Sequence, residues 1–254
     1  MTSDIKSLFP NINCHKIPFF ENVKNTIVLV DNIYRDDLSI LSNSLLSKSS
    51  FQINEKQVIN INLNKSFQDF LYIVNIGKSK NNNSFELNII LDKGTYSNVF
   101  LSFVDDDKSN IRGIINFVLN DDTNITTKAL YINNYSSEYK INIISHHVSS
   151  YSISQLIVKG VLYDSASVDF NMKIIVDKFL KAVSSSELHK VLKLSDSASI
   201  KSVPAIICNT PDTEIHHGFA LSGIDKKSIN FLKSRGINKI NSENILIDSF
   251  ISSI

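Results

Sequence analysis

Short runs of apolar or alternating residues follow one another through most of the chain, with polar turn-forming clusters between them. From about residue 58 to residue 207 the runs recur roughly every 10–15 residues without a helical period, which predicts an all-β core. The clearest predicted strands are Phe70–Ile76, Phe85–Leu91, Val99–Val104, Ile111–Leu119, Ile125–Ile132, Tyr139–Val148, Ile153–Tyr163 and Val168–Val176. A β-branched run, Thr26–Val30, predicts an earlier strand that turns back through a hairpin at Asp31–Tyr34.

The strand pattern leaves three architectures open, because a sandwich, a barrel and a solenoid all consist of short strands joined by turns. No exact internal repeat is visible in the sequence, so periodicity does not choose among them. Before the strand series, the stretch 38–46 predicts a brief helix or turn.

The last 36 residues change from strand to helix signals. Asp225 is a predicted N-cap and Gly236 the left-handed residue that ends the helix. A second helix is expected to start near Asn241, and its apolar positions form one stripe: Ile247, Phe250, Ile251 and Ile254. Either the β domain or a partner protein must cover this stripe, and both alternatives stay open.

Composition narrows the class of protein. A chain of 254 residues forms one large domain without disulfide staples, and its two cysteines, Cys14 and Cys208, are expected to be reduced thiols. A net charge of +1 gives no basis for nucleic-acid binding. No signal peptide and no apolar run of membrane-spanning length is visible, which favours a bacterial cytoplasmic location and leaves an organellar one open.

Several soft motifs in the C-terminal half resemble one known family. They read QLIVKGVLYD from Gln155, FNMKI from Phe170, LKLSDSASI from Leu192, and a Pro-led strand from Pro204 that leads to HHGF and LKSRGI. Together they resemble the SufB/SufD family of SUF iron–sulfur cluster assembly, and SufD most closely. The resemblance implies a right-handed parallel β-helix (β-solenoid) with short C-terminal helices. The expected organisation is a reduced N-terminal segment over 1–50, a β-helix core over 51–218 and a helical segment over 219–254.

The resemblance also implies a function, namely a non-enzymatic scaffold that holds iron or an iron–sulfur cluster transiently at a subunit interface. The implied partners are a SufB-type paralogue, joined through the β-helix, and a SufC-type ATPase that docks on the C-terminal helical region; the choice between a homodimer and a heterodimer stays open. The chain itself has no functional phosphate-binding loop. Gly218 and Gly223 have the spacing of such a loop, but Ile224 and Asp225 replace its essential lysine and hydroxyl residue. A separate ATPase must therefore supply ATP hydrolysis. The residues expected to dock a partner are Phe231, Leu232, Arg235, Ile247 and Phe250.

Two side chains are candidate iron or cluster ligands. His217 matches the histidine of the SufD motif, and imidazole binds iron well. A surface histidine beside a glycine turn is the alternative. Thiolate is the characteristic iron–sulfur ligand, so Cys208 would support a SufB-type role in which the chain holds the cluster itself. The alternative for Cys208 is a small buried side chain in its strand.

The other histidines have weaker expected roles. If residues 215–218 form a strand, His216 points away from His217. One of His146 and His147 is expected to face inward as a structural histidine, and His189 is expected in a polar connection. Cys14 and His15 have no metal-site spacing. A carbohydrate-active β-solenoid enzyme is the alternative of another class, but it needs carboxylates stacked on consecutive coils, and the acidic residues cluster in turns.

Overall fold

The computed structural model describes residues 25–30, 32–35, 49–53, 58–65, 70–80, 83–105 and 109–253. The strands of these residues form two sheets. The first sheet contains, in spatial order, β15 (Thr213–Ser222), β13 (Val183–Lys193), β11 (Ile153–Leu162), β9 (Asn124–Asn133), β7 (Tyr96–Asp105), β5 (Phe70–Gly77), β1 (Thr26–Val30) and β2 (Ile33–Tyr34). The second contains β14 (Ser199–Cys208), β12 (Ser167–Val176), β10 (Glu138–His147), β8 (Asn110–Leu119), β6 (Phe85–Leu91), β4 (Val58–Leu63) and β3 (Ser49–Ile53).

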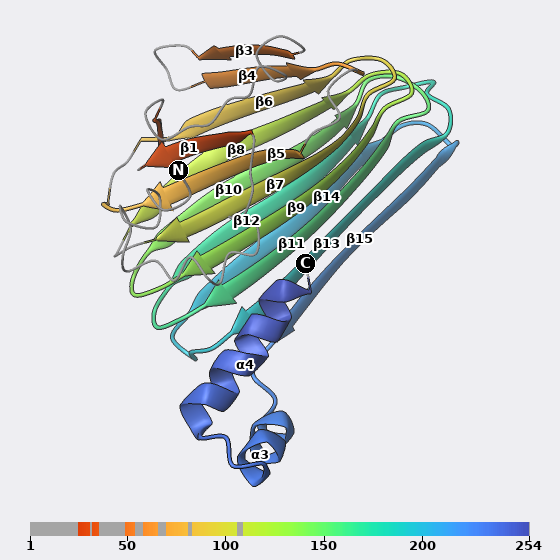
Figure 1. Ribbon diagram of the computed structural model, residues 1–254. Coiled ribbons are helices and arrows are strands. Elements are labelled where there is room, and N and C mark those ends of the chain that lie inside the picture. The colour runs from red at the N-terminus through yellow and green to blue at the C-terminus, as the bar shows by residue number, and fades with distance from the viewer. Residues whose placement is uncertain are drawn as a thin grey trace.

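From β4 to β15 successive strands alternate between the two sheets, so the chain winds as a β-solenoid (Figure 1). Each strand pairs in parallel with the strand one coil away, for example β10 with β8 and with β12. The expected parallel β-solenoid is therefore confirmed. The alternating residues are what the fold requires, because one face of each strand lines the interior and the other faces outward.

The interior between the two sheets, here called the lumen, is the hydrophobic core. In-register pairing places equivalent residues of consecutive coils in rows, and the rows consist mainly of isoleucine, leucine, valine and phenylalanine. Representative fully buried side chains are Leu63, Leu101, Phe117, Ile143 and Phe170. The contact area between stacked rows supplies the driving force for the fold, because apolar burial is the dominant favourable term.

The N-terminal part of the described chain belongs to the same solenoid. β1 pairs in parallel with β5, so the expected N-terminal segment 1–50 contributes a strand to the core instead of preceding it. The predicted hairpin is present, since β1 and β2 pair antiparallel with Asn32 at a φ of 67°. The predicted helix or turn over 38–46, and Cys14 with His15, lie outside the described residues.

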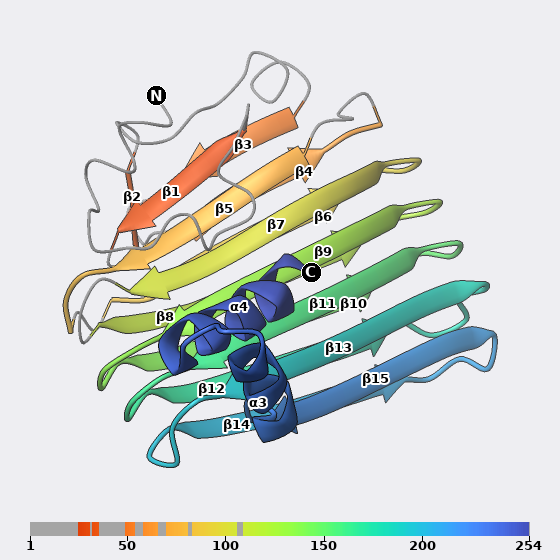
Figure 2. The same ribbon diagram turned by 60° about the horizontal axis from the view of Figure 1, so that its bottom comes forward.

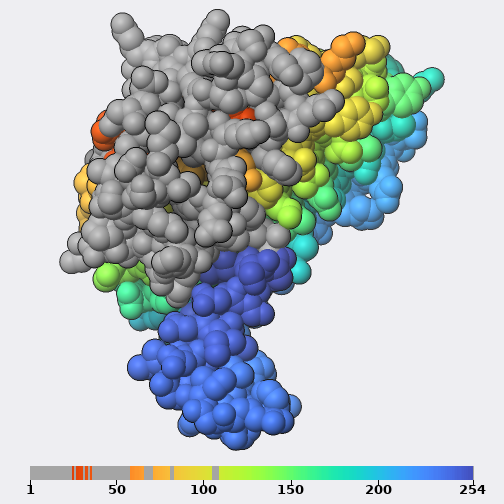
Figure 3. Space-filling model, in the orientation of Figure 1, coloured from red at the N-terminus to blue at the C-terminus, as the bar shows by residue number. Residues whose placement is uncertain are grey.

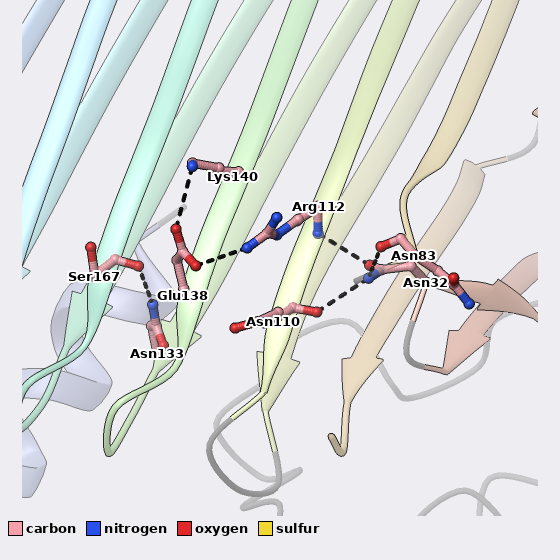
Figure 4. A network of polar contacts seen from close by, with 8 residues as sticks. All are labelled: Asn32, Asn83, Asn110, Arg112, Asn133, Glu138, Lys140 and Ser167. Carbon is pink, nitrogen blue, oxygen red and sulfur yellow. Dashed lines mark hydrogen bonds and ion pairs between the residues drawn. The ribbon is translucent and has the colours of Figure 1, made fainter. Parts of the chain in front are cut away.

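A polar network fixes the chain at this corner of the solenoid (Figure 4). The buried Asn32 amide donates to the carbonyl oxygens of Asn83 and Asn110 and accepts a hydrogen bond from the Arg112 backbone. Arg112 in turn pairs with Glu138, at 2.9 Å. One turn residue thus connects three coils, because its side chain satisfies backbone groups that the strand ends leave unpaired.

Two helices follow the last strand: α3 (Lys226–Ser234) and α4 (Lys239–Ser252). The Asp225 carboxylate accepts hydrogen bonds from two backbone amides of α3, and Gly236 has a φ of 84°, so both predicted helix ends are confirmed. β15 continues to Ser222, four residues past the expected end of the core at residue 218. Figure 3 shows the helical segment projecting from the body of the molecule. Among the described residues, no helix is both long and apolar enough to cross a membrane.

The solenoid itself covers the apolar stripe of α4. Ile247 and Ile251 are buried against Leu130, Val161 and Leu192, which lie on the outer faces of β9, β11 and β13. Figure 2 shows α4 lying across these strands. Of the two alternatives for the stripe, coverage by the β domain is the one observed for Ile247, Phe250 and Ile251; Ile254 lies outside the described residues.

Candidate functional site

The solenoid ends in an uncovered coil. β14 and β15 are the last strands of their sheets, and neither contains a buried residue. Their lumen-facing side chains include Ile206, Phe219 and Leu221, which are 40%, 43% and 49% exposed, whereas the equivalent positions one coil earlier are fully buried. We call this surface, formed by the lumen-facing residues of β14 and β15, the open end. Apolar side chains and unpaired strand edges are exposed there together.

His217 lies at the open end and faces the lumen. The register of β13 and β15 places it over the buried Glu187, and its imidazole is exposed because no coil follows. His216 points to the outer face, where its Nε2 lies 3.1 Å from the Glu214 carboxylate. The predicted opposite orientation of the two histidines is therefore confirmed. Of the two, His217 has the position of a ligand that an approaching ion or protein can reach.

Glu187, which no sequence motif marks, carries a buried carboxyl group in the middle of β13. Its side chain is 2% exposed, and neither carboxyl oxygen has a hydrogen-bond partner. Burial raises the pKa of the Glu187 carboxyl to about 8, so the group is mostly protonated at neutral pH. A buried polar group without a partner is costly and unusual, so the carboxyl group of Glu187 can accept a ligand that supplies the missing partner.

His189 lies two residues further along β13 and is fully buried, so the expected polar connection is wrong. Its Nε2 lies 2.9 Å from the Tyr131 hydroxyl and its Nδ1 2.9 Å from the Ser202 hydroxyl. Phe170 and Phe219 pack on its ring. Burial lowers the pKa of His189 to about 4, so the imidazole is neutral, and both its nitrogens are engaged.

His147 is the inward-facing member of its pair, as predicted. It is fully buried between the hydroxyls of Ser152 and Ser154, at 2.7 and 3.0 Å. Ser154 also hydrogen-bonds to Ser185 on β13. Burial, with a smaller contribution from His146, lowers the pKa of His147 to about 4. Like His189, this histidine is satisfied inside the protein and is not available as a ligand.

Cys208 faces the lumen near the end of β14 and is half-buried. Its Sγ lies 3.4 Å from the Thr210 carbonyl oxygen and 3.5 Å from the Thr213 hydroxyl. Thr213 precedes His217 by four residues, which corresponds to about 13 Å along a strand. The structure therefore does not bring Cys208 and His217 together, and no group of three or more metal-binding side chains occurs among the described residues.

The five residues expected to dock a partner fall into two groups. Phe231 on α3 and Arg235, the C-cap residue of that helix, are exposed, with the guanidinium 5.4 Å from the Phe231 ring centroid, and Leu232 is half-buried. Ile247 and Phe250 instead pack on the solenoid. Both side chains are covered by the solenoid, and their docking role, like that of the α3 residues, stays a prediction. α3 has no buried residue, so its surface is available to another molecule.

Two carboxylates on the outer face of the second sheet are engaged with cations, and a third, Glu86, accepts a hydrogen bond from the Asn88 amide. Glu138 lies between Arg112 and Lys140, and Asp169 pairs with Lys201. A glycosidase needs one carboxylic acid and one carboxylate set apart around a sugar. These ion-paired side chains do not provide that arrangement, which disfavours the carbohydrate-active alternative.

These features define a parallel β-solenoid that carries an accessible imidazole at an uncapped end and a helical segment on its flank. The family described as "SUF system FeS cluster assembly, SufBD core domain" matches residues 74–250, and the chain belongs to that family. A relative from Synechocystis sp., described as an iron–sulfur cluster assembly SufBD family protein, is 26% identical over 96 residues. That similarity covers 38% of this chain and 21% of the relative.

Proposed function

We propose that this chain is a SufD-type scaffold subunit of SUF iron–sulfur cluster assembly and that His217 binds iron destined for a nascent cluster. Family membership supports the assembly role. The observation that carries the proposal is the open end, where an exposed imidazole is surrounded by uncovered lumen residues of both sheets. Iron is the cargo of this site, and it binds transiently.

The partner that fits the open end is a second β-solenoid of the SufB type. The outer edges of β14 and β15 can continue both sheets into another molecule, and the exposed Ile206, Phe219 and Leu221 would be buried by it. A SufC-type ATPase would bind the exposed surface of α3, which includes Phe231 and Arg235. We expect the assembly in the bacterial cytoplasm.

Co-expression with SufB-type and SufC-type subunits and affinity purification of this chain test the proposal. Ile206→Glu should abolish recovery of the SufB-type subunit, because a charge would be buried at the interface. Ile114→Glu is the matched control: both isoleucines are 40% exposed, but Ile114 lies on the outer face of β8. Recovery of a homodimer alone, or of no SUF subunit, would contradict the proposal.

A SufB-type role, in which the chain itself holds the cluster, is the second candidate. The position of Cys208 on the lumen-facing side of the last coil favours it. Iron and sulfide content after anaerobic reconstitution of Cys208→Ser decides between the two roles. A SufB-type role requires loss of the cluster, whereas the SufD-type role predicts unchanged iron binding.

A further inference from the structure

The residues next to Glu187 do not hydrogen-bond to its carboxyl group. Leu156 lies beneath it in register on β11. Its neighbours on the same face of β13 are engaged elsewhere, Ser185 with Ser154 and His189 with Tyr131 and Ser202. The side chain one coil above it is His217. None of these neighbours hydrogen-bonds to Glu187, and the open end is the side from which an approaching group can reach it.

Register brings Glu187 and His217 within reach of a common ligand. Adjacent strands of a sheet are about 4.8 Å apart, and both side chains point into the lumen. Bonds from a transition-metal ion to imidazole nitrogen and carboxylate oxygen are each about 2.1 Å long. Both side chains therefore lie in one lumen row on neighbouring strands, and an ion placed between them is within reach of both.

We propose that Glu187 and His217 together bind one divalent first-row transition-metal ion at the open end. The inference rests on the proposed function, in which that ion is the iron to be loaded. The metal would supply the partner that both oxygens of Glu187 lack, and the carboxyl proton would be released when it binds. A mixed nitrogen and oxygen ligand pair favours such ions over calcium or magnesium.

The remaining polar groups of the region do not complete the coordination sphere. His189 uses both ring nitrogens, His216 faces outward, and Cys208 lies about four residues away along the lumen. Water or a protein seated on the open end must therefore provide the other ligands. This leaves the ion exchangeable, as loading and release of a cargo require.

Titration of the purified full chain with Co²⁺ tests the site, because the visible absorption of bound Co²⁺ reports both its affinity and the type of its ligands. Competition of Fe²⁺ with bound Co²⁺ is then measured anaerobically. We expect one equivalent of Co²⁺ to bind with nitrogen and oxygen ligands. Glu187→Gln and His217→Ala should each weaken binding at least tenfold. Glu187→Gln should fold, because it removes a buried ionisable group. Glu214→Gln is the matched control, an exposed acid on β15 beside the other histidine, and should bind as the wild type does.

Failure of Co²⁺ to bind the wild type, or wild-type affinity in Glu187→Gln, would overturn the inference. Co-purification with SUF subunits is read out separately. Loss of Co²⁺ binding in Glu187→Gln with the subunits still recovered would support the site within the proposed function. Co²⁺ binding through both residues without recovery of any SUF subunit would support the metal site and contradict the proposed function.

Discussion

The Lys159 ammonium donates a 2.6 Å hydrogen bond to the carbonyl oxygen of Phe250, so a strand of the solenoid holds the last turn of α4. It also donates to the Ser253 hydroxyl and lies 5.1 Å from the Phe250 ring centroid. Burial, together with Lys190 and Lys128, lowers the pKa of Lys159 to about 8. A cation at the C-terminal end of a helix is favourable, because it faces unpaired carbonyl oxygens and the negative end of the dipole.

Lys159→Met should loosen α4 while leaving the solenoid folded. Methionine keeps an apolar stem of similar length but donates no hydrogen bond, which removes about 1–3 kcal/mol of local stability. Amide hydrogen exchange over residues 247–253 should therefore accelerate. Lys190→Met, which changes the exposed neighbour on β13, should leave these amides protected. Unchanged exchange in Lys159→Met would show that apolar packing of Ile247 and Ile251 suffices to dock the helix.

Gly160→Ala should destabilise the solenoid, because a Cβ at this position would lie 1.9 Å from the Tyr131 ring. Tyr131 cannot yield easily, since it stacks on Phe170 and hydrogen-bonds to His189. We expect a loss of about 3 kcal/mol in denaturant unfolding. Adding Tyr131→Leu should make the double variant less destabilised than the sum of the single changes.

Gly223→Ala is the control for this clash. Its Cβ would meet the Lys193 carbonyl oxygen at 3.7 Å, an ordinary contact, so its stability should remain near that of the wild type. Equal stability of Gly160→Ala and Gly223→Ala would refute the close packing of Tyr131 against β11.

Asp225→Ala should fray α3, which has no buried residue and depends on its cap. The carboxylate accepts hydrogen bonds from the Ser228 hydroxyl and from the backbone amides of Ser228 and Lys227, and these hold the pKa of Asp225 below its usual value. Loss of such a cap costs about 1 kcal/mol of helix stability. Faster amide exchange over Lys226–Ser234 is the expected result, and Asp225→Asn should largely restore protection. Equal exchange in the wild type and the alanine variant would contradict a capping role.

Most strands could be predicted from the sequence, since one face of each strand is apolar and the other polar. β13 was missed as an element because three of its lumen-facing residues are Ser185, Glu187 and His189, so both faces look polar in the sequence. The prediction of a solenoid depended on the resemblance to the SufB/SufD family, because the coils share a register but no repeated sequence.

His217 could be selected from its motif, whereas its relation to Glu187 could not. Thirty residues separate the two side chains along the chain, and the register of β13 with β15 alone places them in one row. The separation of Cys208 from His217 could not be predicted from the sequence either, because it follows from the position of Cys208 near the end of β14. The sequence of α4 shows an apolar stripe but does not show which molecule covers it, so the packing of Ile247 on the solenoid could not be predicted.

The buried ionisable groups of the lumen predict a stability maximum near pH 6.5. Glu187 has a pKa near 4.5 when unfolded and about 8 when folded, so its contribution to folding declines as pH rises between these values. His147 and His189 are lowered from 6.5 to about 4, and their contribution is lost as pH falls through that window. Between pH 6.5 and 4.5 the two histidines outweigh the one carboxyl, and above pH 6.5 Glu187 dominates.

Glu187→Gln should remove the alkaline decline. At pH 7 it should be more stable than the wild type by about 3 kcal/mol, since the wild type must either hold a proton at Glu187 or bury a charge. Denaturant unfolding from pH 5 to pH 8, with a chelator present to exclude metals, measures both profiles. Glu214→Gln changes an exposed acid and should follow the wild-type curve. A wild-type curve that is flat between pH 6.5 and 8 would show that Glu187 is ionised and solvated in the folded protein.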